Sequence, residues 1–248
     1  MLGHTILAIF IVLTILIVFS TPPEPSQPTA IALSAHDEAY VQVVSTYLTD
    51  PRRISYEVNL VKENVPRPHT GVDVGSSTGE RVKLMNERGL STTGLDNSKY
   101  MVRHAKQNQY PYVYGEYTSP IVFQEQSLSH VTCLNYTYCF IREKGEFLRA
   151  VHQWLEPEGL LFIHVPLEWK YGPSTPKYTS SLVHHTLRET IQLEKTYKMN
   201  RPVYWEHKEK VIRFAETCGF KLERTLILPP PYENDQIVVL KSVDLVYL

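Results

Sequence analysis

Hydrophobic and polar positions along residues 71–165 alternate in a pattern that predicts strands separated by helices. Short apolar runs typical of buried strands occur at 71–75, 92–96, 112–116, 130–135 and 160–165. Apolar residues recur at helical spacing in three segments between them, 79–89, 98–108 and 142–155. Strands that alternate with helices pair in parallel through right-handed crossovers. We therefore expect an α/β fold with a doubly wound, Rossmann-like sheet.

The C-terminal part of the chain has a different pattern. An amphipathic helix is predicted at 207–219, and two strand-like runs follow at 220–228 and 236–248. The link between these runs, "PPPYEND", is too short for the crossover that a parallel pair requires. We expect the sheet to have seven strands, mostly parallel, and to end in an antiparallel hairpin.

A long apolar segment begins the chain. From Leu2 to Phe19 the sequence has few polar residues, and a run of this length is just long enough to cross a bilayer. Residues 1–20 are therefore interpreted as a single-pass transmembrane anchor or signal-anchor, with the domain that follows facing the cytosol. A cleaved signal peptide is the alternative, although no Lys or Arg precedes the run.

The segments after the apolar run divide the remaining chain. Residues 21–30 are rich in proline and predict a stiff, extended linker. Residues 35–48 have helical spacing that stops at Asp50-Pro51. Residues 31–248 are expected to form one domain, with a cap-like insert at 166–206.

Composition narrows the classes of partner. The 248 residues have a formal net charge of −1 and are 43% hydrophobic, which provides a core but no basic field for nucleic acid. The three cysteines lack metal-ligand spacing, and we expect them to be buried free thiols. We expect neither a metal nor a nucleic-acid partner.

The stretch "GVDVGSSTGE", residues 71–80, predicts a ligand-binding loop. A strand, a small-residue loop and a helix N-terminus direct backbone N–H groups toward the carboxyl edge of a parallel sheet. Gly75 and Gly79 permit a close approach of a ligand or a positive φ. Asp96 ends the next strand, where a carboxylate can accept hydrogen bonds from a ribose. Together these residues predict a ligand with an adenosine-like nucleoside, although Asp73 and Asp96 could also be structural carboxylates.

Two common nucleotide motifs do not match. The spacing "GSSTG" lacks the third glycine of the dinucleotide fingerprint, and no lysine of the P-loop type follows it. An NAD(P)-dependent oxidoreductase is therefore a weaker alternative.

The motifs in their order resemble class I S-adenosylmethionine-dependent methyltransferases. "VDVGSSTGE" is similar to the first motif of that family, "GLDNS" to the second and "YGE" to the third. "HVTCLNYT" occupies the fourth strand, "WLEPEGLLFIHV" resembles the turn and fifth strand, and the expected terminal hairpin is also a family feature. The resemblance covers most of residues 70–242. Ser77 and Glu158 stand where the family usually has glycine.

The resemblance implies S-adenosyl-L-methionine as the cofactor and assigns roles to individual residues. Asp73, Gly75, Ser76, Ser77 and Gly79 would line the methionine end. The other expected contacts are Asp96 with Asn97 and Ser98 at the ribose, Glu116 at the adenine, and Asn135 with Tyr136 closing the pocket. For Glu116, an ordinary polar loop is the main alternative.

The reaction implied is an in-line displacement, which needs a base only if the acceptor arrives protonated. His164, Glu168 and Tyr136 are weak candidates, and a packed core histidine is the favoured interpretation of His164. His184 and His185 are interpreted as part of a solvated face rather than metal ligands.

The insert at 166–206 is rich in aromatic residues, which suits a planar, apolar small-molecule or lipid-like acceptor as well as ordinary packing. The sequence therefore predicts a membrane-tethered methyltransferase. A non-catalytic module that kept the fold is the first alternative.

Overall fold

The computed structural model describes residues 31–34, 37–65, 70–168, 178–183, 186–193 and 197–243. All of them belong to one compact unit, Ile31–Leu248. The expected anchor, the whole of the expected linker, His184 and His185 lie outside the described residues. Among the helices that are described, none combines the length and the apolar character needed to span a bilayer.

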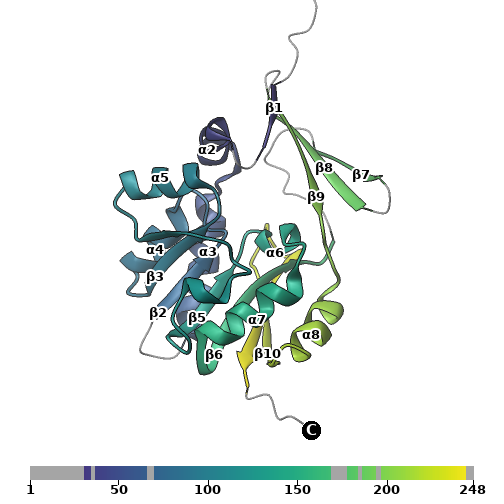
Figure 1. Ribbon diagram of the computed structural model, residues 1–248. Coiled ribbons are helices and arrows are strands. Elements are labelled where there is room, and N and C mark those ends of the chain that lie inside the picture. The colour runs from purple at the N-terminus through teal and green to yellow at the C-terminus, as the bar shows by residue number, and fades with distance from the viewer. Residues whose placement is uncertain are drawn as a thin grey trace, which may run out of the picture. The chain divides into compact units, whose positions relative to one another are not determined.

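A seven-stranded sheet forms the centre of the unit (Figure 1). Its spatial order is β10-β11-β6-β5-β2-β3-β4, and β6, β5, β2, β3 and β4 run parallel to their neighbours in this series. β11 is antiparallel to β6, and β10 to β11. The strands are β2 (Thr70–Val74), β3 (Ser91–Asp96), β4 (Tyr112–Tyr114), β5 (Leu128–Cys133), β6 (Leu155–Pro166), β10 (Phe220–Ile227) and β11 (Asp235–Ser242). The expected fold and its antiparallel ending are confirmed.

Helices cover both faces of this sheet. Successive side chains of β6 point to opposite faces of the sheet, and both faces are apolar. Leu161 and Ile163 belong to one core cluster, and Leu160 and Phe162 belong to the other. α7 (Lys144–Trp154) and α8 (Lys208–Glu216) pack in the first cluster, and α3 (Pro51–Asn64) and α4 (Glu80–Glu87) in the second. α5 (Lys99–Gln107) packs beside β4. The remaining helices are short: α2 (Glu38–Val43), the π-helix η1 (Val44–Leu48), the 3₁₀ turn η2 (Pro120–Val122) and α6 (Thr137–Phe140).

Helix α3 begins where the sequence pattern predicts only a stop. Asp50 takes the N-cap position, and its side chain accepts from the backbone N–H groups of Arg52 and Arg53. Pro51 follows at the first helical position, where its missing N–H costs nothing. The pair Asp50-Pro51 therefore starts a second helix, which the sequence analysis missed.

The insert contains strands that the sequence analysis did not predict. β7 (Tyr178–Val183), β8 (Thr186–Leu193) and β9 (Tyr197–Val203) form antiparallel pairs, and β1 (Ile31–Leu33) adds to β9 in parallel. This four-stranded sheet joins the segment that follows the proline-rich stretch to the insert. The expectation of a cap-like insert stays a prediction.

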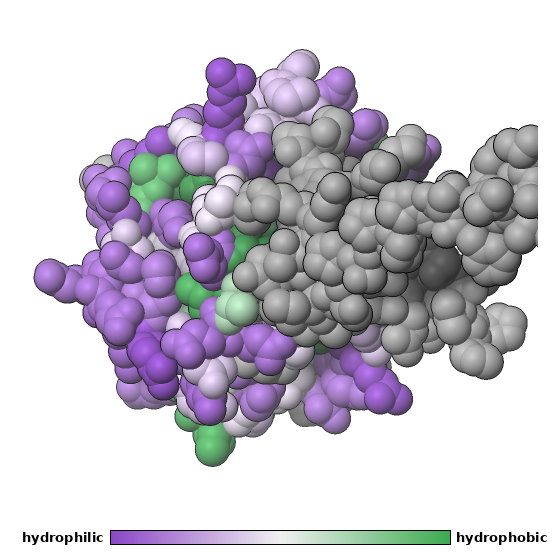
Figure 2. Space-filling model, turned by 90° about the horizontal axis from the view of Figure 1, so that it is seen from above, coloured by the Kyte–Doolittle hydropathy of each residue, from purple (hydrophilic) through white to green (hydrophobic). Residues whose placement is uncertain are grey.

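The three cysteines, Cys133, Cys139 and Cys218, are buried and free, as expected. Among the coloured residues of the face seen from above, most are hydrophilic, and small groups of hydrophobic residues lie between them (Figure 2).

Candidate functional site

The predicted cofactor-binding residues lie at the carboxyl ends of four neighbouring strands. Asp73 lies near the end of β2, and Gly75 to Gly79 follow that strand. Asp96 ends β3, with Asn97 and Ser98 after it, Glu116 follows β4 and Asn135 follows β5. Because β5, β2, β3 and β4 are adjacent and parallel, these ends meet at one edge of the sheet.

The loop after β2 turns through left-handed backbone conformations. Gly75 has φ 64°, Ser77 φ 57° and Gly79 φ 100°. The backbone N–H groups of Gly75 and Ser76 both donate to the carbonyl of Leu95, which ties the loop to β3. The positive φ values explain the two glycines, and they show that Ser77 adopts a conformation that favours glycine.

Protein side chains already occupy the space beside these glycines. A Cβ added at Gly75 would lie 2.3 Å from Cγ2 of Thr137, and one added at Gly79 would lie 2.6 Å from the ring of Tyr110. The glycines are therefore required by the backbone and by the packing of neighbouring side chains. The approach of a ligand to them stays a prediction.

Asp96 connects the loops after β2 and β3. One carboxylate oxygen accepts from the N–H of Ser77 at 2.9 Å, and the other from the N–H of Ser98 at 2.8 Å. Within the described part of the chain, the hydroxyl of Ser98 is buried without a hydrogen-bond partner. Ser98 holds the N-cap position of α5, and its hydroxyl makes no capping bond to the helix.

Asp73 is fully buried beneath the loop. Its carboxylate accepts from the hydroxyls of Ser76 at 2.6 Å and Thr132 at 2.7 Å, and it pairs with Arg81 at 3.3 Å. Three protein partners hold this carboxylate, and through Ser76 it positions the loop.

The residues beyond β4 are more open to solvent. Glu116 is exposed and accepts from the amide of Asn97 at 3.3 Å. Tyr117, which the sequence analysis missed, lies beside them, and burial followed by the charge of Glu116 raises its pKa to about 12. This phenol therefore stays protonated, and its ring packs against Phe147 with centroids 6.4 Å apart.

Asn135 and Tyr136 follow β5 in two consecutive left-handed conformations, with φ 49° and 65°. Such conformations are costly for residues with side chains and are often retained at functional sites. Asn135 is half-buried. The phenol of Tyr136 is buried, accepts from Arg53 at 3.0 Å and donates to Asp235 at 3.1 Å.

His164 is a packed core histidine with both ring nitrogens engaged. Nδ1 accepts from the backbone N–H of Tyr136 at 3.1 Å, which assigns the proton to Nε2, 3.1 Å from a carboxylate oxygen of Asp235. Burial and the nearby Arg53 lower the pKa of His164, so the ring is neutral at pH 7. Glu168 is exposed. The structure therefore provides no free base at His164 or Tyr136.

A chain of buried ion pairs, which we call the buried ion chain, runs beneath this edge. It links Asp73 to Arg81 (3.3 Å), Arg81 to Glu57 (3.0 Å), Glu57 to Arg53 (3.1 Å) and Arg53 to Asp235 (2.9 Å). None of the five side chains is more than 9% exposed. The sequence analysis missed Arg53, Glu57, Arg81 and Asp235, although Arg53 and Glu57 have the i,i+4 spacing of a helical ion pair.

The pairing keeps these groups charged. Burial alone would raise the pKa of Glu57, but Arg81 and Arg53 hold it below its ordinary value. Burial opposes ionisation of Asp235 in the same way, and its contacts with His164 and Arg53 lower its pKa. The pKa of Arg81 is raised, because Asp73 and Glu57 outweigh the effect of burial.

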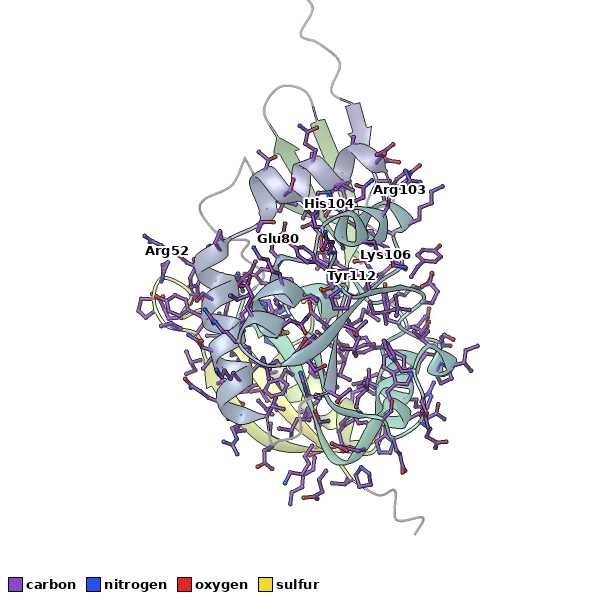
Figure 3. All side chains as sticks on the ribbon, turned by 90° about the vertical axis from the view of Figure 1, so that its left-hand side faces the viewer. Arg52, Glu80, Arg103, His104, Lys106 and Tyr112 are labelled. Carbon is purple, nitrogen blue, oxygen red and sulfur yellow. The ribbon has the colours of Figure 1, made fainter. Side chains whose placement is uncertain are left out.

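A groove of about 340 Å³ lies beside this edge, between α5 and the segment formed by α2 and η1. Arg103 and His104 of α5 line it opposite Glu38 and Gln42. Figure 3 shows Arg103 and His104 facing α2, and Tyr112 deeper in the same region. The hydroxyl of Tyr112 donates to the carbonyl of Ser77 at 3.1 Å, which supports the loop from this side.

Comparisons with known proteins agree with this geometry. Residues 72–163 match the family model of a methyltransferase domain. A carboxy-S-adenosyl-L-methionine synthase of Trichodesmium erythraeum is 28% identical over 189 residues, which cover 71% of this chain and 65% of that protein. The match therefore spans just under two thirds of the relative's length.

Solved structures share the fold at low identity. The sugar N-methyltransferase KedS8 of Streptoalloteichus sp. has a TM-score of 0.63 at 15% identity, covering 88% of this chain and 99% of that one. The amino pentose methyltransferase CalS10 of Micromonospora echinaspora, solved with S-adenosylmethionine bound, has a TM-score of 0.60 at 13% identity, covering 85% and 99%.

Proposed function

We propose that this chain, a class I S-adenosylmethionine-dependent methyltransferase by its domain and fold, transfers a methyl group to a small organic acceptor. The cofactor is S-adenosyl-L-methionine, the methyl donor of this family. The observation that carries the proposal is the position of Asp96, whose buried carboxylate ends β3 and anchors the loop of Gly75 to Gly79.

The residues at the strand ends fit an adenosyl group. A ribose offers two hydroxyl donors, and a carboxylate such as that of Asp96 accepts such bonds. The buried hydroxyl of Ser98, two residues away, has no partner among the residues that the structure describes, and buried polar atoms are rarely left unpaired. We assign Asp96 and Ser98 to the ribose.

The remaining contacts are assigned by position. Glu116 and Asn97, which already hydrogen-bond each other, would accept and donate at the adenine, with Tyr117 beside them. Ser76, Ser77 and Asn135 would line the methionine end, while Asp73 would position the loop from below. A bound sulfonium cofactor supplies an activated methyl group, so the chain's own residues mainly orient the reactants and exclude water.

No base is assigned. His164 and Tyr136 have their polar atoms in hydrogen bonds inside the protein, and Glu168 is exposed. An acceptor that carries a free lone pair, such as an amine, fits this arrangement, because its methylation needs no base before transfer.

A second candidate function follows from the relative named as a carboxy-S-adenosyl-L-methionine synthase. Its product carries a carboxylate in addition to the single carboxylate of S-adenosylmethionine, and a buried carboxylate needs a positive partner. Of the described cations beneath this edge, Arg53 and Arg81 each already pair with two carboxylates. This pairing favours methyl transfer.

The function is tested by binding and by product analysis. Isothermal titration of the full chain with S-adenosylmethionine should give a 1:1 complex, and Asp96→Asn should weaken it about tenfold to a hundredfold, because hydrogen bonds to a charged group are lost. The exposed Glu125→Gln is the matched control. No binding at millimolar cofactor would rule the proposal out. Binding without transfer of labelled methyl to any component of a cell extract would favour a non-catalytic module.

Tethering to a membrane is a further part of the proposal, supported by the apolar run at residues 2–19. The proline-rich residues that follow would space the domain from the surface, with the domain in the cytosol. The full chain should stay in the pellet after alkaline carbonate extraction of cell membranes, and a chain that starts at residue 31 should not. Release of the full chain into the supernatant would argue against an anchor.

A further inference from the structure

The buried ion chain carries an unbalanced charge. It contains three carboxylates, those of Asp73, Glu57 and Asp235, against two guanidinium groups, those of Arg81 and Arg53. His164, which contacts both Arg53 and Asp235, is neutral. One negative charge is therefore left over in the interior.

The excess charge lies where water screens it little. Glu57, the central member of the buried ion chain, is fully buried, and it pairs with both guanidinium groups. Mobile ions screen exposed charges strongly and buried ones much less. A buried unit charge therefore influences ligands that do not touch it.

The buried ion chain contacts two of the four loops that form the proposed cofactor site, those after β2 and β5. Asp73 holds Ser76 in the loop after β2, and Asp235 holds Tyr136 beyond β5. Glu57 and Arg53 come from α3, outside the residues 72–163 that match the methyltransferase domain. Part of the buried charge beneath the site therefore comes from α3, a helix that lies outside the residues matched by the methyltransferase family.

We propose that the excess negative charge of the buried ion chain makes the site discriminate between the cationic methyl donor and its neutral product. S-adenosylmethionine has a sulfonium charge and a net charge of about +1 at pH 7, whereas S-adenosylhomocysteine is a thioether with a net charge near zero. The inference rests on the proposed function. Glu57 is then a positioning residue that acts through charge rather than through contact.

The test compares the affinities of the two ligands in the full-length protein by isothermal titration. Glu57→Gln removes one negative charge and leaves each arginine one carboxylate, Asp73 for Arg81 and Asp235 for Arg53. We expect it to lower the ratio of donor affinity to product affinity on the order of tenfold, the size of effect that Coulomb's law gives for any two unit charges on the order of 10 Å apart at an effective dielectric constant of about 20. The change should persist in high salt, because the charge is buried.

Two further variants separate charge from structure. Asp235→Asn removes a charge from the other end and should lower the ratio in the same direction, so it replaces Glu57→Gln if that variant does not fold. Arg81→Lys keeps the charge but loses the paired contacts of the guanidinium, and it should leave the ratio near that of the unmodified protein.

The outcomes are distinct. A lower ratio in Glu57→Gln or Asp235→Asn with an unchanged ratio in Arg81→Lys supports the inference. Equal weakening of both ligands in all three variants would show a purely structural role and overturn it, while the proposed function would stand. If the unmodified protein binds neither ligand, the proposed function itself fails.

Discussion

Ser77 and Glu158 have backbone conformations that usually belong to glycine, with φ 57° and 67°. Left-handed backbone costs an L-residue about 1–2 kcal/mol, because Cβ approaches the following carbonyl. Both are positions where the resembled family has glycine. At Ser77 the conformation is held by the bond from its N–H to Asp96. At Glu158 the side chain has only an exposed ion pair with Lys241 at 3.5 Å.

Replacing Glu158 by glycine should therefore stabilise the protein. Glu158→Gly is expected to be about 1 kcal/mol more stable than Glu158→Ala, since both lose the ion pair but only glycine relieves the strain. The free energy of unfolding in urea measures the difference. Glu156→Gly, at a neighbouring position of β6 without positive φ, should be destabilising. Equal stabilities of Glu158→Gly and Glu158→Ala would contradict the argument.

At the scale of elements, α3 supplies two of the three residues that connect Asp73 and Asp235 through ion pairs. It begins at an Asp50-Pro51 cap, presents Arg53 and Glu57 one turn apart, and packs Val58 and Val61 into the core beside α4. The cap sets where the helix starts and hence where both charged residues lie.

Loss of the cap should weaken the whole unit. Asp50→Ala removes the acceptor for two backbone N–H groups and for the hydroxyl of Tyr232 at 2.5 Å, and we expect a loss of about 1–2 kcal/mol of unfolding free energy. Asp50→Ser retains an N-cap acceptor and should lose less than half as much. Urea denaturation followed by circular dichroism measures both. A loss in Asp50→Ser as large as that in Asp50→Ala would assign the effect to Tyr232 rather than to the cap.

At the scale of the whole molecule, the neutral His164 links stability to pH. Its folded-state pKa is lowered by burial and by Arg53, whereas an unfolded histidine titrates near pH 6.5. Below that pH the unfolded state binds a proton that the folded state does not, so stability falls as the solution becomes more acidic. The pKa values of Glu57 and Asp235 are also lowered in the folded state, so these carboxylates cause a further loss of stability at more acidic pH, below about pH 4.5.

The free energy of unfolding should therefore drop between pH 7.5 and pH 5.5 on account of this histidine, by at most about 1.4 kcal/mol, the value for a folded ring that takes up no proton in this interval. In His164→Gln the drop over the same interval should be smaller by about that amount, even though the variant is less stable at both pH values. Parallel pH dependences in the two proteins would show that His164 is not the group responsible.

The local order of residues determined most of the fold. Apolar runs bounded by glycine, proline and aspartate set the strands of the sheet, and the short link before β11 required an antiparallel ending. The loop of Gly75 to Gly79 and the strand-end Asp96 were predictable, because φ, turn chemistry and the direction of a strand are local properties.

Contacts between distant segments decided the rest. No sequence pattern singled out Glu57, and only the fold brings Arg81 and Arg53 to it within the core. β1 pairs with a strand more than 160 residues away, so no local pattern predicts it. His164 becomes a satisfied core residue only because Tyr136, Arg53 and Asp235 converge on it from three other elements. Burial and charge compensation arise from this convergence, and tertiary structure alone specifies them.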